Sequence, residues 1–310
     1  MGGTRTRPAI FEGAPAAHLA PDHLLRAGAP VEDGSGVDFV GDALRTPLAA
    51  ALPDHEVRVD LSLAGAFDGA TWRAWSGHLL GIFERPLWGV PATGRLAWLR
   101  FGCFEREEGG RVAETLLLLD LPSLMRRAGV WPLAEPPGPD PMAPAPRPVA
   151  SAGDTAASLA RVEAMIAGLM RYDGGSLASM GMRDHWVPQF NWFGPAAIGS
   201  FRGHADYERG HQGPFLRAFP DRVGGNHRAR IAEGGLVAST GWPSIRATHR
   251  GDGWLGLAAT GRAVTMRVMD FWAVEDGLIT DNWVMIDVPD LLAQLGVDLF
   301  GALDGSGTDG

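Results

Sequence analysis

The sequence contains no lysine, one cysteine and two tyrosines among its 310 residues. All 27 basic residues are therefore arginines, which excludes Schiff-base catalysis by lysine and the phosphate-binding lysine of P-loop proteins. Because Cys103 has no second cysteine to pair with, an intrachain disulfide and a thiolate zinc cluster are excluded as well. This cysteine usage is typical of a reducing compartment.

The chain also lacks a long apolar run and an excess of positive charge. No segment approaches the roughly 18 consecutive apolar residues that a transmembrane helix needs, and the N-terminus lacks the apolar core of a signal peptide. A net charge of −9 argues against sequence-independent binding to nucleic acid, which requires a basic face. We therefore expect a cytoplasmic protein with neither membrane nor nucleic acid as a partner.

An internal repeat is the most informative feature that the sequence does contain. Residues 92–130 match residues 259–297 without a gap, at an offset of 167 residues (259 − 92). Both segments open with the tetrapeptide Ala-Thr-Gly-Arg. The repeat predicts two copies of one structural unit.

The region between the copies, residues 134–154, is rich in proline and alanine. Such a composition sustains neither a helix nor a β-ladder and is typical of a semi-rigid spacer. A chain of this length suits about two domains of roughly 150 residues each. We predict a first domain over residues 37–133, a linker over 134–154 and a second domain over 155–303.

The polarity pattern of the second copy predicts helices followed by long curved strands. Helical periodicity indicates two helices, at residues 157–171 and 207–219. Alternation indicates four strands, the last two a hairpin around Asp276-Gly277, at residues 228–232, 236–250, 263–275 and 278–286. The expected fold class is α+β, as two cone-shaped half-barrels built on curved antiparallel sheets.

Several short motifs of the second copy occur together in one known family. They are Trp192-Phe193-Gly194-Pro195, Phe219-Pro220-Asp221, Thr260-Gly261-Arg262, Glu275-Asp276-Gly277, Asn282-Trp283 and Gln294-Leu295-Gly296. This set resembles SnoaL-like polyketide cyclases, within the larger group that shares the fold of nuclear transport factor 2 and ketosteroid isomerase. The likeness covers nearly all of residues 155–300, whereas the first copy has altered opening helices and is degenerate. The resemblance implies a cone closed over a pocket, and acid–base chemistry without a cofactor on small carbonyl compounds.

Asp270 is the first candidate for catalysis because its strand face is otherwise apolar. Val268 and Trp272 share that face, while Arg267 lies on the other. Desolvation raises the pKa of a carboxyl in such a wall, which suits a general acid or base, or a protonated donor to an enolate oxygen. The resemblance places the acidic donor of the ketosteroid isomerase branch here, and the first copy has Cys103 instead. A buried aspartate paired for structural reasons is the alternative.

Two histidines are candidate catalytic partners of Asp270. His227 alternates with Ala229, opposite Arg230, and is expected to point inward, and His249 has inward parity in the next strand. A satisfied core histidine is the alternative for each. No tight histidine spacing with a carboxylate occurs, so neither a metal nor another cofactor is expected.

Aromatic residues of the second copy are expected to line a pocket for a flat, hydrophobic ligand. The expected substrate-binding residues are Trp192, Trp242, Trp272, Asn282, Trp283, His204 and His211. Core packing is the alternative for each tryptophan. Several cyclases of the family carry an acid directly after the tryptophan of the last strand, where this chain has Val284, and this departure weakens the case for cyclisation itself.

These patterns predict a cofactor-independent acid–base enzyme acting on a small hydrophobic carbonyl compound, of cyclase, isomerase, dehydratase or hydrolase type, with its site in the second domain. The alternative is a non-catalytic module of the same fold that binds a small ligand or serves assembly. The resemblance further implies that the two domains can pack as a pseudo-dimer, as single-domain relatives do through their sheets, and that a homodimer is compatible with the fold.

Overall fold

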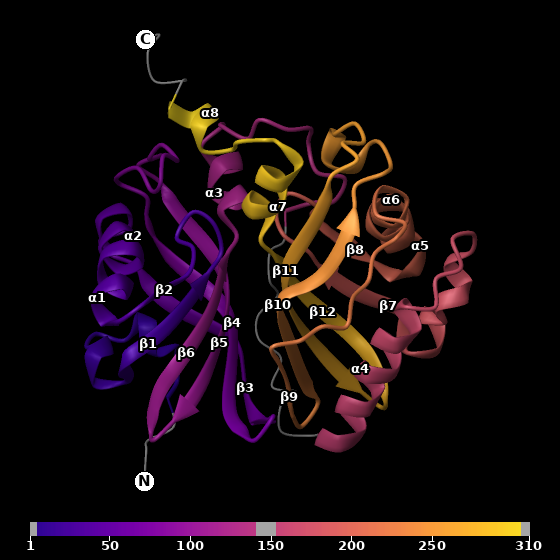
Figure 1. Cartoon of the computed structure of the whole chain (residues 1–310), viewed down its shortest axis with the longest axis horizontal. Helices are drawn as coiled ribbons and strands as arrows, with labels where there is room; N and C mark the ends of the chain where they lie inside the picture. The colour runs from indigo at the N-terminus through magenta and orange to yellow at the C-terminus, as the bar shows by residue number, and fades with distance from the viewer. Residues whose placement is uncertain (1–4, 141–152, 305–310) are drawn as a thin grey trace. The chain divides into compact units, whose positions relative to one another are not determined.

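The computed structural model describes residues 5–140 and 153–304, which form two compact units, each built on one sheet (Figure 1). Unit 1 runs through Pro132 and takes in the chain from Asp287 onward, whereas unit 2 spans Leu133–Ile286. Of the linker expected over residues 134–154, residues 141–152 lie outside the described residues, and the domain bounds stay a prediction. None of the helices within the described ranges is long and apolar enough to cross a membrane.

Both sheets have six strands in the same order. The order is β2-β1-β6-β5-β4-β3 in unit 1 and β8-β7-β12-β11-β10-β9 in unit 2, so adding six to each number converts one into the other. The strands of unit 1 are β1 (Leu19–Ala27), β2 (Gly34–Ser35), β3 (Glu56–Phe67), β4 (Ala70–Ile82), β5 (Leu96–Glu108) and β6 (Arg111–Leu119). Those of unit 2 are β7 (Trp186–Phe193), β8 (Ser200–Arg202), β9 (Ala229–Glu233), β10 (Leu236–Thr248), β11 (Ala263–Glu275) and β12 (Leu278–Ile286). The tandem repeat is confirmed over whole sheets.

Strand pairing is antiparallel except for one pair in each sheet. β1 pairs in parallel with β6, and β7 pairs in parallel with β12. The α+β class with curved sheets is confirmed, and the parallel pairs refine it, because alternation within a strand carries no information about the direction of a distant partner. The hairpin of β11 and β12 begins and ends at the predicted residues.

Short helices accompany the sheets. They are α1 (Val37–Phe39), α2 (Thr46–Ala51), α3 (Leu121–Arg127), α4 (Thr155–Leu169), α5 (Gly203–Tyr207), α6 (Gly213–Ala218), α7 (Val288–Leu295) and α8 (Gly301–Asp304). Asp154 caps α4 by accepting hydrogen bonds from two backbone N–H groups of its first turn. A π-helical stretch, Glu208–Gln212, joins α5 to α6 in one helical segment, which includes most of the helix predicted at 207–219. In unit 2, α4, α5 and α6 lie against one face of the sheet (Figure 1).

Candidate active site in unit 2

A cavity of about 180 Å³ lies between the sheet of unit 2 and the helices that cover it. Since one water needs about 10–15 Å³ of such space, the cavity has room for a small organic molecule. Its lining is mostly apolar and includes Met165 of α4, Phe215 of α6, and Met266 and Val268 of β11. An apolar wall with a few polar groups is the usual composition of a small-molecule site.

Asp270 is the one carboxylic acid among the described residues that line this cavity. Val268 and Trp272 line the cavity beside it, as alternation along β11 predicts. Asn282 Nδ2 donates a hydrogen bond to Asp270 Oδ1 at 3.3 Å. Burial raises the pKa of Asp270 to about 7, while the Asn282 hydrogen bond and the charge of Arg230 act in the opposite direction. Near neutral pH this carboxyl group therefore populates both protonation states.

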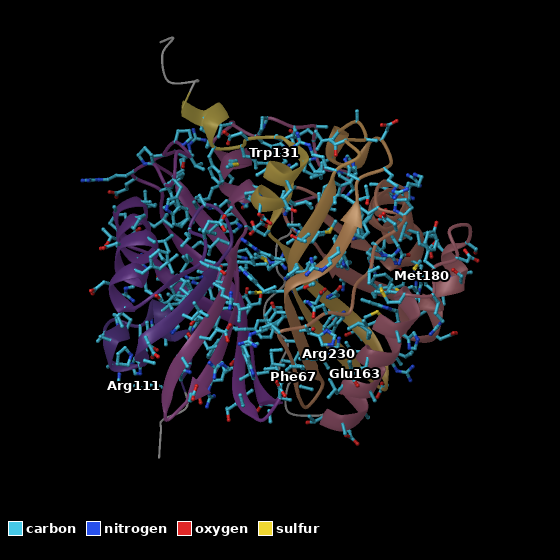
Figure 2. All side chains as sticks on the ribbon, viewed as in Figure 1. Phe67, Arg111, Trp131, Glu163, Met180 and Arg230 are labelled. Carbon is cyan, nitrogen blue, oxygen red and sulfur yellow. The ribbon has the colours of Figure 1, made fainter. Side chains whose placement is uncertain are left out.

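His227 also lines the cavity, where it is hydrogen-bonded to Arg230. Arg230 Nη2 donates to His227 Nδ1 at 2.8 Å, so the neutral ring carries its proton on Nε2. Burial, followed by the charge of Arg230, lowers the pKa of His227. Arg230 Nη1 in turn pairs with Glu163 at 3.2 Å, and Figure 2 shows these two side chains next to each other. His227 therefore cannot accept a proton on Nδ1 without giving up Arg230.

The expectation that Arg230 faces away from His227 is wrong, because both side chains line the cavity. The physical reason is that β9 begins at Ala229, so His227 lies outside the regular strand and alternation does not apply to it. Arg230 is thus a cavity residue that the sequence analysis missed. Arg230 itself lies in the regular ladder, where it pairs with Ser239, which in turn pairs with Asp270, so alternation counted within β9 places it on the cavity face.

His249, the second candidate partner of Asp270, does not line the cavity. It follows the end of β10 at Thr248, and its ring lies 5.2 Å from that of Phe219, so it packs beyond the residues that line the cavity. The side chain is fully buried and its Nδ1 accepts the backbone N–H of Thr260 at 3.3 Å. The structure gives His249 a packing role at a loop rather than a place beside Asp270.

Four of the expected substrate contacts line the cavity: Trp192, Trp272, Asn282 and His211. Three do not line it: Trp242, Trp283 and His204. Successive strand residues point to opposite faces, so Asn282 and Trp283 cannot both face the cavity, and Trp283 stacks on Phe193 with ring centroids 5.5 Å apart. His204 packs edge-on against Phe190 at 5.0 Å.

His211 lies against Trp192, with ring centroids 4.2 Å apart and an interplanar angle of 20°. Burial lowers the pKa of His211 to about 3, so the imidazole is neutral at physiological pH. Within the described part of the chain, its Nδ1 atom has no hydrogen-bond partner. The ring also stacks on Phe215 at 5.6 Å, so His211 is a neutral aromatic part of the cavity lining.

Tyr207 is a second cavity residue that the sequence analysis missed. Its side chain is 9% exposed, and burial together with the charge of Asp270 raises the pKa of its hydroxyl group, which stays protonated. The sequence analysis placed it at the start of a predicted helix. That position alone gave no reason to choose Tyr207 over the other polar residues of the helix.

Unit 1 presents the same strand face to a different environment. At the offset of 167 residues, Val268, Asp270 and Trp272 of unit 2 correspond to Phe101, Cys103 and Glu105. Burial raises the pKa of the Cys103 thiol well above its ordinary value, so this position holds a neutral group. The repeat therefore preserves the backbone of the site but not its acid.

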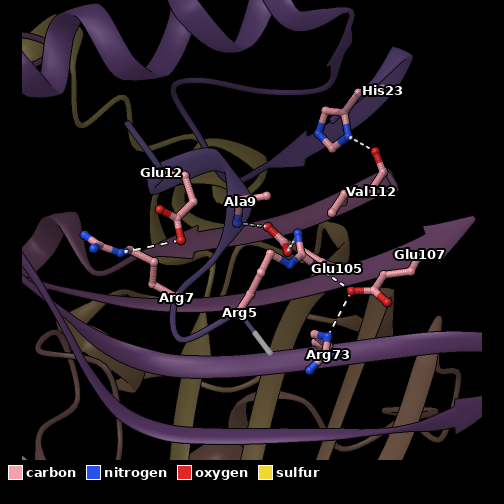
Figure 3. Close-up of polar contacts among 9 residues, drawn as sticks. All are labelled: Arg5, Arg7, Ala9, Glu12, His23, Arg73, Glu105, Glu107 and Val112. Carbon is pink, nitrogen blue, oxygen red and sulfur yellow. Dashed lines mark hydrogen bonds and ion pairs between the residues drawn. The ribbon is translucent and has the colours of Figure 1, made fainter. Parts of the chain in front are cut away.

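The chain itself covers this face in unit 1. A short helical turn, η1 (Ala9–Phe11), packs there, with the ring of Phe11 5.2 Å from that of Phe101. The backbone N–H of Ala9 donates to Glu105 Oε1 at 2.6 Å (Figure 3). The side chains that would line a cavity in unit 1 are thus covered by the N-terminal segment.

Glu105 is fully buried and pairs with Arg5 at 3.0 Å. Burial raises the pKa of Glu105 to about 7, although Arg5 and the backbone donors of the N-terminal turn act to lower it. Arg5 also pairs with Glu107, and Arg73 reaches the same carboxylate (Figure 3). This network anchors the segment, so the candidate site for a small molecule is the cavity of unit 2.

Three solved structures illustrate what the chain is similar to. AclR of Streptomyces galilaeus, a candidate hydroxylase, is 27% identical over 46% of this chain and 87% of its own, with a TM-score of 0.37. IdmH of Streptomyces antibioticus, a candidate polyketide cyclase, is 27% identical over 44% of this chain and 98% of its own, with a TM-score of 0.33. An NTF2-like protein of Burkholderia thailandensis is 21% identical over 46% of this chain and 98% of its own, with a TM-score of 0.37.

No curated protein matches the chain. A family model does match, over residues 182–295, and its description is SnoaL-like polyketide cyclase. The matched residues contain every strand of unit 2, the helical segment of α5 and α6, and all the polar cavity residues described above. Through these residues the second half of the chain is similar to the SnoaL-like polyketide cyclase family.

Proposed function

We propose that unit 2 is a cofactor-independent acid–base enzyme that acts on a small hydrophobic carbonyl compound, with Asp270 as the group that moves the proton. The observation that carries the proposal is a carboxyl group with a pKa of about 7 in the wall of a mostly apolar cavity. A catalytic acid or base is most effective when its pKa lies near the working pH, because both protonation states are then accessible.

In the proposed reaction the Asp270 carboxylate removes a proton from the carbon next to the carbonyl group. The C–H bond breaks, its electron pair moves to the carbonyl oxygen as an enolate, and the carboxyl group holds the proton. Return of that proton to another carbon completes an isomerisation. In an aldol-type cyclisation the enolate carbon attacks a second carbonyl carbon, the π bond of that carbonyl opens to an alkoxide, and the proton held by Asp270 passes to the alkoxide. Since Val284 lines the cavity where several cyclases carry an acid, one carboxyl group must both take and return the proton.

The experiment that tests the proposal compares two aspartate variants of one hairpin. Asp270→Asn removes the base and is expected to lower turnover of an active carbonyl substrate by about 10²–10⁴-fold. Asp276→Asn is the matched control, because this exposed residue lies in the turn after β11 and its left-handed backbone (φ 50°) tolerates asparagine. Product formation is followed by mass spectrometry on a panel of carbonyl compounds, and equal rates for Asp270→Asn and the wild type would contradict the proposal.

A binding module of the same fold is the second candidate function. The observation that favours it is that His211 and His227, the two histidines in the cavity lining, are both held neutral, so neither assists Asp270 as a charged acid. The two candidates differ in one measurement. A compound that binds the wild type tightly but yields no product over a long incubation identifies a binding protein.

A further inference from the structure

Three buried N–H groups in the cavity lining have no hydrogen-bond partner among the described residues. They are Arg230 Nε, Trp186 Nε1 and Trp272 Nε1. The exposed fractions of the three side chains are 8%, 3% and 4%, so water reaches none of them easily. An unsatisfied buried donor costs about 1–3 kcal/mol, so three around one cavity indicate a ligand that supplies acceptors.

Arg230 differs from the two tryptophans because it carries a charge and is held by two partners. Its Nη1 pairs with Glu163 at 3.2 Å and its Nη2 donates to His227 Nδ1 at 2.8 Å. Glu163 is half exposed, and its carboxylate lies outside the lining of the cavity. The two contacts fix the planar guanidinium group and leave Nε unsatisfied, which is the arrangement of a preorganised donor.

The described residues that line the cavity include two arginines and one acid. The charged or ionisable side chains that line the cavity are Arg222, Arg230 and Asp270, together with the neutral His211, His227 and Tyr207. The guanidinium group of Arg222 already has a backbone partner, since its Nη2 donates to the Leu169 carbonyl oxygen at 2.8 Å. When Asp270 holds its proton, Arg230 is therefore a buried cation whose salt-bridge partner, Glu163, is not among the residues that line the cavity.

We propose that the ligand of unit 2 carries an anionic oxygen on a flat apolar ring system, and that Arg230 is the residue that selects it. The inference depends on the proposed function only in taking this cavity as the substrate site. The oxyanion accepts from the Arg230 guanidinium group, the indole N–H groups of Trp186 and Trp272 donate to further oxygens, and the ring system lies among the aromatic and methionine side chains. The ligand class is an aromatic or polycyclic acid, or an acidic enol, with at least one more oxygen.

Two probes of equal size and shape test the inference, 2-naphthoate and 2-naphthamide, which differ in charge. Their binding to the whole chain is measured by isothermal titration calorimetry at pH 6, where Asp270 is largely protonated. The wild type is expected to bind the naphthoate at least tenfold more tightly than the amide. Arg230→Met is expected to weaken naphthoate binding by about 10–100-fold, the value of a charge-assisted hydrogen bond, and to change amide binding by less than about threefold.

Arg228→Met is the matched control, because Arg228 is exposed and lies outside the cavity lining. It is expected to leave both affinities unchanged. If Arg230→Met does not fold, as judged by its circular dichroism spectrum, Arg230→Lys keeps the charge but loses the planar group, and is expected to reduce the preference for naphthoate while retaining amide binding.

Four results would overturn the inference: no naphthoate binding to the wild type, equal affinities for the two probes, equal weakening of both by Arg230→Met, or an equal effect of Arg228→Met. The outcome is separable from that of the proposed function because neither probe is turned over. Preference for naphthoate in a protein that converts no carbonyl compound would support this inference and contradict the proposed enzymatic function. Activity that depends on Asp270, in a protein that binds both probes equally, would support the enzymatic function and contradict this inference.

Discussion

Asp270 is subject to opposing influences on its pKa. The apolar wall favours the protonated form, while the hydrogen bond from Asn282 and the charge of Arg230 favour the carboxylate. Their balance gives a pKa of about 7, so the fraction of carboxylate rises as the pH increases through neutrality. A general base acts in its ionised form, and activity limited by Asp270 therefore increases with pH across this range.

Replacement of Asn282 by leucine tests this balance. The substitution removes the hydrogen bond that lowers the pKa of Asp270, so we expect the rising limb of kcat/KM against pH to move to higher pH. The pH profile of the wild type and of Asn282→Leu, recorded on the same substrate, measures the shift. A midpoint that stays in place, or moves to lower pH, would show that another group controls the profile.

The residues of the site were predictable only where the backbone is regular. Asp270 lies in the interior of β11, so alternation placed it correctly among Val268 and Trp272. The direction of Arg230 was misjudged because parity was counted from His227, which lies before β9 begins, and His249 is buried but lies beyond the end of β10 and outside the cavity lining. Whether a donor lacks a partner depends on residues far apart in the sequence, so no local pattern reveals it.

At the scale of elements, turn chemistry decided which boundaries could be predicted. The hairpin of β11 and β12 was predicted to the residue because Asp276 and Gly277 both adopt positive φ, which aspartate and glycine tolerate and which few other residues do. The N-terminal turn η1 had no such signal, because three residues hold too little periodicity to predict a buried role.

Ile10 is the residue of η1 that tests how the N-terminal segment stabilises unit 1. Its side chain is fully buried, and Arg45 Nη1 donates to its carbonyl oxygen at 2.7 Å. Ile10→Ala is expected to reduce the free energy of unfolding of unit 1 by about 2–5 kcal/mol, because it leaves a cavity. Leu96→Ala is the matched control in the same unit, since Leu96 is 54% exposed and its loss is expected to cost less than about 0.5 kcal/mol.

Both variants are measured by urea denaturation with tryptophan fluorescence, and the midpoints are compared at a constant slope. Equal effects of Ile10→Ala and Leu96→Ala would show that the segment contributes no packing to unit 1, and that its contacts with β5 are incidental.

At the scale of the whole molecule, each unit buries one acid with a raised pKa on the same strand of the repeat. Glu105 of β5 and Asp270 of β11 both have a pKa of about 7 in the folded chain, against ordinary values of 4.5 and 3.8. Between about pH 4 and pH 7 the folded state therefore holds protons that the unfolded state has released. Stability falls as the pH rises through this window and is constant with respect to these groups above it.

Two variants separate the contributions of the units. For Glu105, a pKa raised by about 2.5 corresponds to a loss of about 3 kcal/mol between pH 4.5 and 7, because each pKa unit is worth about 1.4 kcal/mol. Glu105→Gln removes the titrating group and keeps an acceptor for Ala9, so the unfolding of unit 1 should lose this pH dependence while that of unit 2 retains its own. Asp270→Asn should have the reciprocal effect.

Calorimetric unfolding at pH 5 and pH 8 measures both effects, with Glu108→Gln as the control because its carboxylate lies on the same strand but is 70% exposed. Arg5 pairs with both Glu105 and Glu107, and Glu105→Gln leaves Arg5 and Glu107 in place, so the slope that disappears belongs to Glu105. If Glu105→Gln and the wild type lose equal stability between the two pH values, the carboxylate is ionised throughout. The pair with Arg5 would then outweigh the burial of Glu105, and the N-terminal segment would be held by a full ion pair.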